Sequence, residues 1–395
     1  MKNIALYLED PPTRDGVVST GLSRVNRHVI AALGERLVLT VLSDLRLRNA
    51  VRMVDLDQAV AHKHMWALRL APVRPWSIDA WRRAAGMYVS LSSTQLKAVA
   101  NAQKSAEINV LMVPVGTDVG AISRGLQIGD ALRVPVMVYM VDDPIADAAL
   151  RGRLWSKAQV DALSSVLRSC SRVFAITPGL ARVLGDRHGV EATCLPLPYV
   201  PAATMPSDAH ATSDVVFIGN TSHFYRDGLV DCAEAIGRLR HQGLPVRLVC
   251  TLGGEFVEGL RKRWGDDTIA VVPCPTDADL ARCLSGALAA FAPYSFAEKF
   301  GDMVRTSYPS KLTEYLAHSA RIIVQAPRDS SAAVLLAAHG LPTLLNCPGP
   351  DPLADVIAEL FTKRPDCRYQ YRHWLCNYHD PNRFVTALIK GARQE

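Results

Sequence analysis

A segment in the C-terminal half, residues 308–317, carries residue types whose spacing could bind a ligand. It reads Tyr-Pro-Ser-Lys-Leu-Thr-Glu-Tyr-Leu-Ala, and its apolar residues follow helical spacing from about Ser310, whose hydroxyl can cap the first turn. Backbone N–H groups at a helix start attract anions, and Lys311 adds a positive charge there. Glu314, one turn later, can accept hydrogen bonds from a ribose diol. The spacing fits a nucleoside diphosphate, and it also fits an ordinary capped amphipathic helix.

Short apolar runs that alternate with helical patterns must position this segment, which predicts an α/β fold. The chain has 395 residues, more than one core normally holds, so two domains are expected. A Pro-rich, polar run at 196–213 marks the boundary. We predict domains at 1–198 and 199–370, with a C-terminal helix at 371–395 that packs back on the first. The predicted strands are 2–8, 37–42, 108–115, 134–141, 171–176, 214–219, 246–252, 269–273, 287–292 and 321–326.

The pattern Pro-Ser-Lys-Leu-x-Glu-Tyr-Leu-Ala, followed by the short apolar strand, resembles the donor-nucleotide motif of family 4 and related GT-B glycosyltransferases. The family usually ends this motif in a Gly-Lys-Pro turn, where this chain has His318-Ser319-Ala320-Arg321. The resemblance implies two Rossmann-like domains facing across a cleft. It also implies transfer of a sugar from a UDP- or GDP-sugar to a glycan or lipid-linked acceptor, with retention and without a metal. In that reading Lys311 and the N–H groups near Ser310 hold the diphosphate, and Glu314 holds the ribose.

The resemblance extends to residues after other predicted strands. Gly21 lies near a helix start, where the family's loop faces the donor diphosphate. Two family cations contact that diphosphate; Asn220 replaces the first, and Arg226 is the nearest cation to the second. Gly253 follows a strand and can let a ligand approach the backbone, although an ordinary turn explains it too. Pro273 lies where the family holds the nucleobase, mainly through backbone groups.

Acidic residues in two regions of the chain could contact the acceptor and the donor sugar. Asp142 and Asp143 follow the strand at 134–141, at the carboxyl edge where α/β sheets bind ligands. Either could orient an acceptor hydroxyl or act as a base, and a turn that starts a helix is the alternative. Many family members carry a glutamate eight positions before Glu314, and Thr306 stands there in this chain. Glu298 or Asp302 could replace that acid.

Composition excludes several classes of protein. No run of eighteen apolar residues is present, and the N-terminus lacks the apolar core of a signal peptide, so a cytoplasmic protein is expected. The nine cysteines form no Cys-x-x-Cys pair, which argues against a cysteine-based metal site. Residues 45–105 hold ten Lys or Arg against three Asp, together with three of the six Trp. This basic stretch is either a solvated face or a contact with an anionic membrane on the inner face; no nucleic-acid partner is expected.

The sequence therefore predicts a glycosyltransferase. Its site residues are Asp142, Arg226 and Lys311 for the chemistry, and Gly21, Gly253, Pro273, Ser310, Lys311 and Glu314 for the donor. Two alternatives remain, and the departures from the family pattern at Asn220 and Thr306 motivate the first of them. One is a catalytically inactive scaffold subunit of a glycan-assembly complex. The other is a sugar-nucleotide epimerase on the same fold.

Overall fold

The computed structural model describes residues 3–8, 21–34, 38–43, 99, 107–200, 210–341 and 344–391. These residues form two compact units. Unit 1 takes the described residues as far as Val200 and again from His379 onward, and unit 2 takes those from 210 to Tyr378. The chain therefore passes from unit 1 to unit 2 and returns near its C-terminal end. Most of the basic stretch at 45–105 lies outside the described residues.

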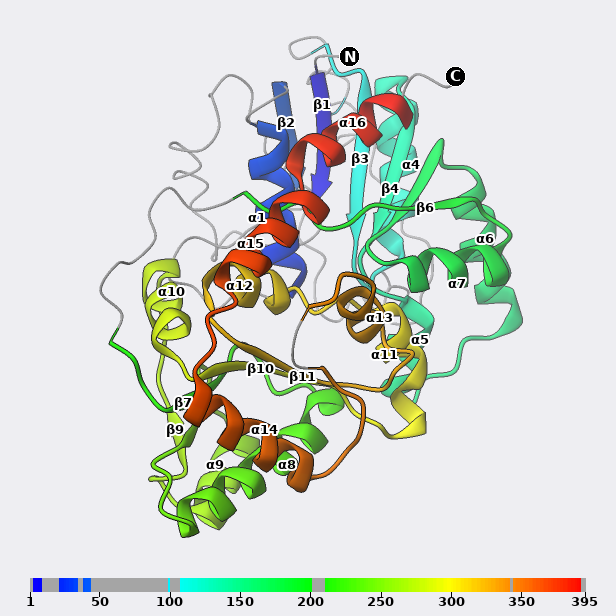
Figure 1. The fold of residues 1–395 in the computed structure, drawn as a ribbon. Coiled ribbons are helices and arrows are strands. Elements are labelled where there is room, and N and C mark those ends of the chain that lie inside the picture. Colours follow the sequence, from blue (N-terminus) through cyan, green and yellow to red (C-terminus); the bar gives the residue numbers. More distant parts are fainter. Residues whose placement is uncertain are drawn as a thin grey trace. The chain divides into compact units, whose positions relative to one another are not determined.

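Unit 1 is built on a six-stranded parallel sheet in the order β2-β1-β3-β4-β5-β6. Figure 1 shows β1, β3 and β4 side by side in this sheet. Every residue of β3 and β4 is buried, as expected for parallel strands covered on both faces. The strands are β1 (Asn3–Leu8), β2 (Val38–Ser43), β3 (Val110–Val115), β4 (Val136–Met140), β5 (Arg172–Ala175) and β6 (Ala192–Cys194).

The helices of unit 1 come from both ends of the chain. The described ones are α1 (Gly21–Gly34), α4 (Gly120–Leu132), α5 (Pro144–Leu150), α6 (Lys157–Arg168), α7 (Pro178–His188) and α16 (Pro381–Gly391). Helix α16, red in Figure 1, contacts α1. Its Phe384 ring lies edge-on to Tyr139 of β4, with centroids 5.5 Å apart. A Cβ at Gly391 would lie only 3.2 Å from the Arg172 side chain, so this helix packs closely on the sheet.

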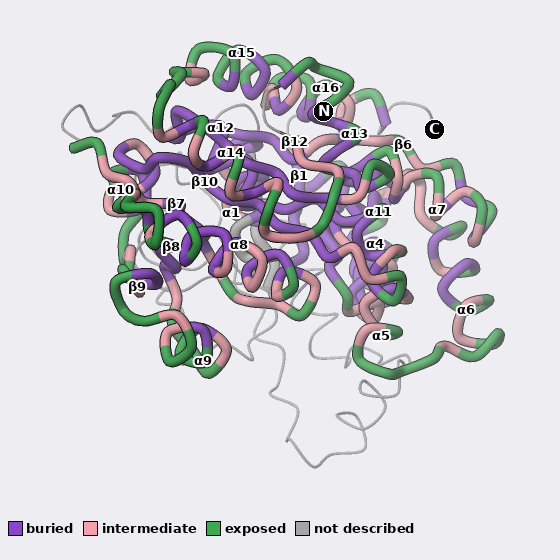
Figure 2. The backbone as a smooth tube through the Cα atoms, turned by 60° about the horizontal axis from the view of Figure 1, so that its bottom comes forward, coloured by how far each residue is buried: buried purple, intermediate pink, exposed green. Residues whose placement is uncertain are grey.

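The second unit repeats the plan with a parallel sheet in the order β12-β11-β10-β7-β8-β9. Its strands are β7 (Asp214–Phe217), β8 (Arg247–Cys250), β9 (Ile269–Val271), β10 (Ala289–Pro293), β11 (Ile322–Gln325) and β12 (Leu344–Leu345). The described helices are α8 (His223–His241), α9 (Glu255–Trp264), α10 (Asp277–Gly286), a short 3₁₀ turn (Glu298–Phe300), α11 (Gly301–Thr306), α12 (Lys311–His318), α13 (Ser331–Ala338), α14 (Pro350–Lys363) and α15 (Arg368–Tyr378). All of α12 is buried, and Figure 2 draws this helix in purple.

Helix α8 corrects one expectation from the sequence. The Ala- and Leu-rich pattern from about Leu229 predicts a helix that begins there, but the helix begins at His223. The reason is packing in the first turns. The ring centroids of Tyr225 and Phe217 are 5.7 Å apart, and Gly228 allows the helix to approach Pro293 closely. A Cβ at Gly228 would fall 2.5 Å from the Pro293 side chain. Contacts with β7 and β10 thus favour helix in a stretch without clear apolar periodicity.

Candidate functional site

The loops after β7, β8 and β9 lie on one edge of the unit 2 sheet. These strands are neighbours and parallel, so their carboxyl ends point the same way, the usual place for a ligand in an α/β sheet. Gly219, after β7, has φ +87°, and its N–H donates to Thr251 Oγ1 at 3.2 Å. Gly253 follows β8 and Pro273 follows β9, and both are exposed. The sheet order therefore brings together backbone groups that the sequence predicted separately.

Tyr315 anchors α12 to this edge. Its hydroxyl accepts from the Ile218 N–H at 3.0 Å and donates to the Phe291 carbonyl at 3.0 Å, and the side chain is fully buried. The first partner follows β7 and the second lies in β10. In the sequence pattern, Tyr315 is only one of the apolar positions of the helix. Its hydroxyl is the one polar group on the apolar stripe of this helix, and this feature of the sequence could have indicated a buried hydrogen bond.

Lys311 begins α12 with its charge among aromatic rings. Its Nζ lies 3.9 Å from the centroid of Phe217 and 3.7 Å from that of Tyr225, and the residue is only 8% exposed. Both distances are well inside the range of a cation–π contact, which strengthens when the cation is desolvated. Burial raises the pKa of the nearby Cys250 thiol to about 12, and the charge of Lys311 opposes that rise. A fixed positive charge therefore lies beside the end of β7.

Glu314, one turn along α12, is 6% exposed. Its Oε2 lies 3.7 Å from Nε2 of His318, which is equally buried. Burial lowers the pKa of His318, and the carboxylate of Glu314 opposes this. His318 was expected in the turn after the helix and without a role, but it is the last residue of the helix.

The expected cap at Ser310 is not formed. Ser310 has φ −52° and ψ −24°, inside the helical region, and its side chain makes no capping hydrogen bond. A capping side chain needs an extended backbone to reach the N–H groups of the next turn. The turn is held instead by its neighbours: Thr313 Oγ1 donates to the Ser310 carbonyl at 2.6 Å, and the Leu312 N–H donates to the Pro309 carbonyl at 2.7 Å.

Arg226 lies in the first turns of α8, after the glycine loop. Its Nε donates to the Thr221 carbonyl at 3.1 Å, and its guanidinium stacks over Phe256 with 5.0 Å to the ring centroid. The half-buried side chain braces the loop that carries Asn220. Asn220 itself accepts from Ser222 Oγ at 2.6 Å.

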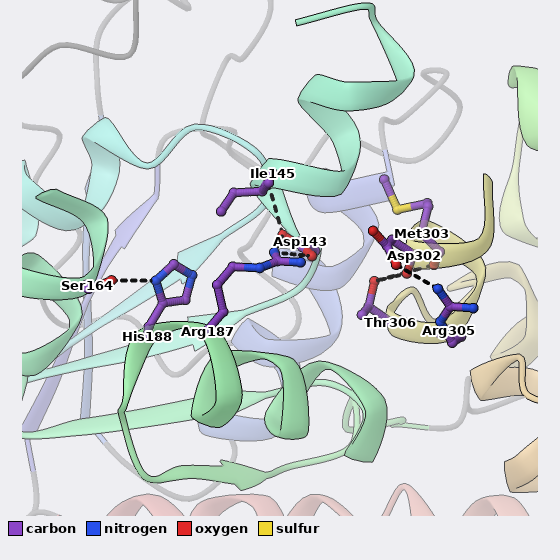
Figure 3. Close-up of polar contacts among 9 residues, drawn as sticks. All are labelled: Asp143, Ile145, Ser164, Arg187, His188, Asp302, Met303, Arg305 and Thr306. Carbon is purple, nitrogen blue, oxygen red and sulfur yellow. Dashed lines mark hydrogen bonds and ion pairs between the residues drawn. The ribbon is translucent and has the colours of Figure 1, made fainter. Parts of the chain in front are cut away.

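In unit 1, the two candidate acids after β4 separate into different roles. Asp143 accepts from the Ile145 N–H at 2.9 Å, caps α5, and pairs with Arg187 at 2.8 Å, as Figure 3 shows. Its carboxylate therefore holds the helix start. Burial, with the charges of Asp147 and Asp143, raises the pKa of Asp142 to about 6. An acid of that pKa is ionised at neutral pH and still able to accept a proton, so Asp142 is the better candidate base.

Several solved structures match the whole chain. HepE of Anabaena, solved in complex with UDP, matches with a TM-score of 0.66 and 13% identity over 99% of each chain. A glycosyltransferase of Rickettsia africae matches with a TM-score of 0.66 and 10% identity over 100% of this chain and 99% of its own. An alpha-glucosyltransferase solved with UDP and a 13-mer DNA containing an HMU base matches with a TM-score of 0.62 and 11% identity over 99% of each chain. No family model and no curated protein matches this sequence.

The chain has the GT-B fold. The prediction of an α/β protein with two Rossmann-like domains is therefore confirmed. The departures from the family pattern are now placed within that fold. Thr306 is buried in α11 and donates to the Asp302 carbonyl at 2.8 Å (Figure 3). Asp302 is exposed and pairs with Arg305 at 2.7 Å, so this candidate replacement acid already has a cationic partner.

The unusual turn after α12 has a structural explanation in Arg321. Its guanidinium donates to the carbonyls of Leu288, Ala287 and Pro365, the last two at 3.0 and 3.1 Å. The residue is buried, and burial lowers its pKa. Arg321 therefore joins the start of β11 to the segment before β10 and to the loop between α14 and α15.

Gly21 is the first residue of α1, as its predicted place near a helix start requires.

Within the part of the chain that the structure describes, no three His, Cys, Asp or Glu side chains gather as a metal site would need. Among those same residues, no helix has the length and apolar character to cross a membrane. The predicted membrane contact at 45–105 lies outside the described residues apart from Val99.

Proposed function

We propose that this chain transfers a glycosyl group, with retention, from a UDP- or GDP-sugar to a glycan or lipid-linked acceptor. The observation that carries the proposal is the carboxyl edge of the unit 2 sheet. There, exposed loops with backbone donors lie in one row, and α12 supplies Lys311 and Glu314. The UDP in the complexes of HepE and of the alpha-glucosyltransferase supports a uridine nucleotide as the first ligand to test.

In the proposed reaction, the bond between the anomeric carbon and the diphosphate oxygen breaks. The acceptor oxygen bonds to that carbon on the face that the diphosphate leaves, as retention requires, and loses its proton. Negative charge grows on the departing diphosphate. Lys311, Arg226 and the N–H groups near Ser310 would stabilise it, because preorganised positive groups act most strongly where charge develops. Glu314 would accept hydrogen bonds from the ribose. Asp142, ionised at neutral pH, would orient the acceptor hydroxyl and take its proton.

A second candidate, a binding or scaffold subunit without turnover, is favoured by two replaced positions. Asn220 supplies no charge, and its side chain is engaged with Ser222. Thr306 directs its hydroxyl to the backbone of its own helix. A chain that lacks both groups could bind a sugar nucleotide and leave it intact.

Turnover separates these candidates. The purified chain is incubated with a panel of UDP- and GDP-sugars, with and without a membrane-lipid extract as acceptor, and the nucleotides are followed by chromatography. Release of UDP or GDP that requires acceptor supports transfer. Interconversion of free sugar nucleotides would indicate an epimerase, and binding without consumption would indicate a scaffold. Glu314→Ala should weaken UDP binding by about 1–3 kcal/mol, the scale for an unpaired buried polar group, and unchanged affinity would remove Glu314 from the site.

Two further parts of the proposal rest on the sequence. We propose that the reaction needs no metal ion. EDTA should therefore leave turnover unchanged, and added Mg²⁺ should not raise it. We also propose that the protein works in the cytoplasm at an anionic membrane surface, through the basic stretch 45–105. Replacing Arg82 and Arg83 by Gln should reduce sedimentation with anionic vesicles; unchanged sedimentation would indicate a solvated basic face.

A further inference from the structure

Helix α12 ends in a buried pair of titratable groups. Glu314 and His318 are four residues apart, so their side chains are neighbours on one face of the helix. Nε2 of His318 lies 3.7 Å from Oε2 of Glu314, and each residue is 6% exposed. This distance exceeds that of a hydrogen bond, so the neutral imidazole makes no hydrogen bond to Oε2 of Glu314.

Packing alone does not explain an imidazole at this position. Nδ1 of His318 is buried and has no hydrogen-bond partner among the residues that the structure describes. The residue's backbone carbonyl accepts from Ser285 Oγ at 3.3 Å, a bond that any side chain at 318 would allow. Buried polar atoms are usually satisfied, and an exception calls for an explanation. An apolar side chain would fill the same space without that cost.

The charges around His318 come from three helices. Glu314 on α12 and Asp277 at the start of α10 favour the protonated imidazole, and Arg372 on α15 opposes it. Strand β10, which also packs against α12, carries no titratable side chain. Burial has the largest effect and lowers the pKa of His318 below its usual 6.5, so the imidazole is neutral at pH 7. Acidification therefore places a new positive charge next to Glu314.

We propose that His318 is a positioning residue for Glu314 that makes nucleotide binding acid-sensitive. Neutral His318 does not compete with the ribose hydroxyls for the Glu314 carboxylate. Protonated His318 pairs with that carboxylate and competes with the ribose for it. This inference rests on the proposed function, because it takes Glu314 as the ribose acceptor. Only the neutral fraction of the protein is then fully competent, so below the pKa of His318 the apparent Kd for the nucleotide rises by up to about tenfold per pH unit.

The test is the affinity for UDP, measured by calorimetry between about pH 5.5 and about pH 8 for the wild type, His318→Gln and His241→Gln. His241 is the exposed last residue of α8 and serves as the matched control. Titration of the UDP phosphate is common to all three proteins and cancels in their ratios. The wild type and His241→Gln should lose affinity towards low pH more steeply than His318→Gln. Parallel profiles for the wild type and His318→Gln would overturn the inference.

A second measurement needs no variant at 318. Coupling between two binding events is reciprocal, so saturating UDP should lower the pKa of His318, followed by NMR of the ring protons. In Glu314→Gln this shift should disappear; an unchanged pKa with bound UDP in the wild type would contradict the inference. His318→Leu replaces the Gln variant if the latter does not fold. A chain that binds neither UDP nor GDP at any pH would instead overturn the proposed function. The His318–Glu314 pairing would then be judged by NMR alone, and a pKa of His318 that is the same in Glu314→Gln would reject it.

Discussion

The ammonium nitrogen of Lys311 lies 3.9 Å from the centroid of the Phe217 ring, at the last residue of β7. The ring of Tyr225, from the first turns of α8, is 3.7 Å away. Two aromatic rings therefore fix this cation in place. A charge oriented before a ligand arrives needs no reorganisation during the reaction.

Replacing Lys311 by Met should separate charge from packing. The flexible thioether suits a site lined by aromatic rings, so the fold should be kept. UDP binding should weaken by about 2 kcal/mol, about thirtyfold in Kd, because a charge-assisted contact is lost. Calorimetry measures the affinity, and Lys299→Met is the control, since Lys299 is exposed and its Nζ lies 4.9 Å from the Phe300 ring centroid. Lower stability with unchanged affinity would limit Lys311 to a packing role.

Tyr315→Phe should destabilise the protein through two buried backbone groups. Without the hydroxyl, the Ile218 N–H and the Phe291 carbonyl both lose their partner. We expect a loss of about 3 kcal/mol in the free energy of unfolding, measured by denaturant titration. Tyr369→Phe removes the same group from an 80% exposed side chain and should change stability by less than about 0.5 kcal/mol. Equal effects of the two changes would show that the Tyr315 hydroxyl does not anchor α12.

Arg321→Lys tests the guanidinium that replaces the family's turn. A lysine cannot donate to three carbonyls with the planar geometry of Arg321, so one or more carbonyls lose their partner. The free energy of unfolding should fall by about 2 kcal/mol. The same change at Arg282, whose side chain is 60% exposed, should have little effect. If Arg321→Lys is as stable as the wild type, the carbonyl contacts do not account for the arginine.

Asp142→Asn should change the pH dependence of stability. The pKa of Asp142 is raised from 3.8 to about 6, so the folded state holds this proton more tightly than the unfolded state. Stability therefore falls as pH rises from about 4 to about 6, and the loss is complete above about 6. The Asn variant should be more stable than the wild type by about 3 kcal/mol at pH 7.5 and similar near pH 4.

Thermal unfolding at several pH values measures this, with the exposed Asp161→Asn on α6 as the control. A difference of constant size at every pH would mean that Asp142 titrates normally. The same variant examines its proposed role in the reaction. Transfer should be lost at every pH while UDP affinity is retained, and full activity would assign the acceptor hydroxyl to another group.

Most strands were predictable because buried parallel strands read as uninterrupted apolar runs. Thr177, which is followed by Pro178, has the residue type of a helix cap, and its side chain accepts from the Leu180 N–H. The start of α8 was not predictable, since it depends on contacts of Tyr225 and Gly228 with distant strands. Ser310 looked like a cap by residue type, yet its backbone conformation is helical.

The sequence predicted which residues form the candidate site better than it predicted their contacts. The sequence placed Lys311 and Glu314 on one helix, and both are there. It could not show that Lys311 stacks on Phe217, because that contact joins segments far apart in the chain. The choice between Asp142 and Asp143 needed the partner Arg187, which comes from α7.

The return of the chain to unit 1 has a consequence for synthesis. Helix α16 covers the sheet of unit 1, but the ribosome makes it after every residue of unit 2. During synthesis, the N-terminal half therefore has an apolar surface that α16 does not yet cover. In a fragment that ends at Val200, this surface would stay exposed to solvent.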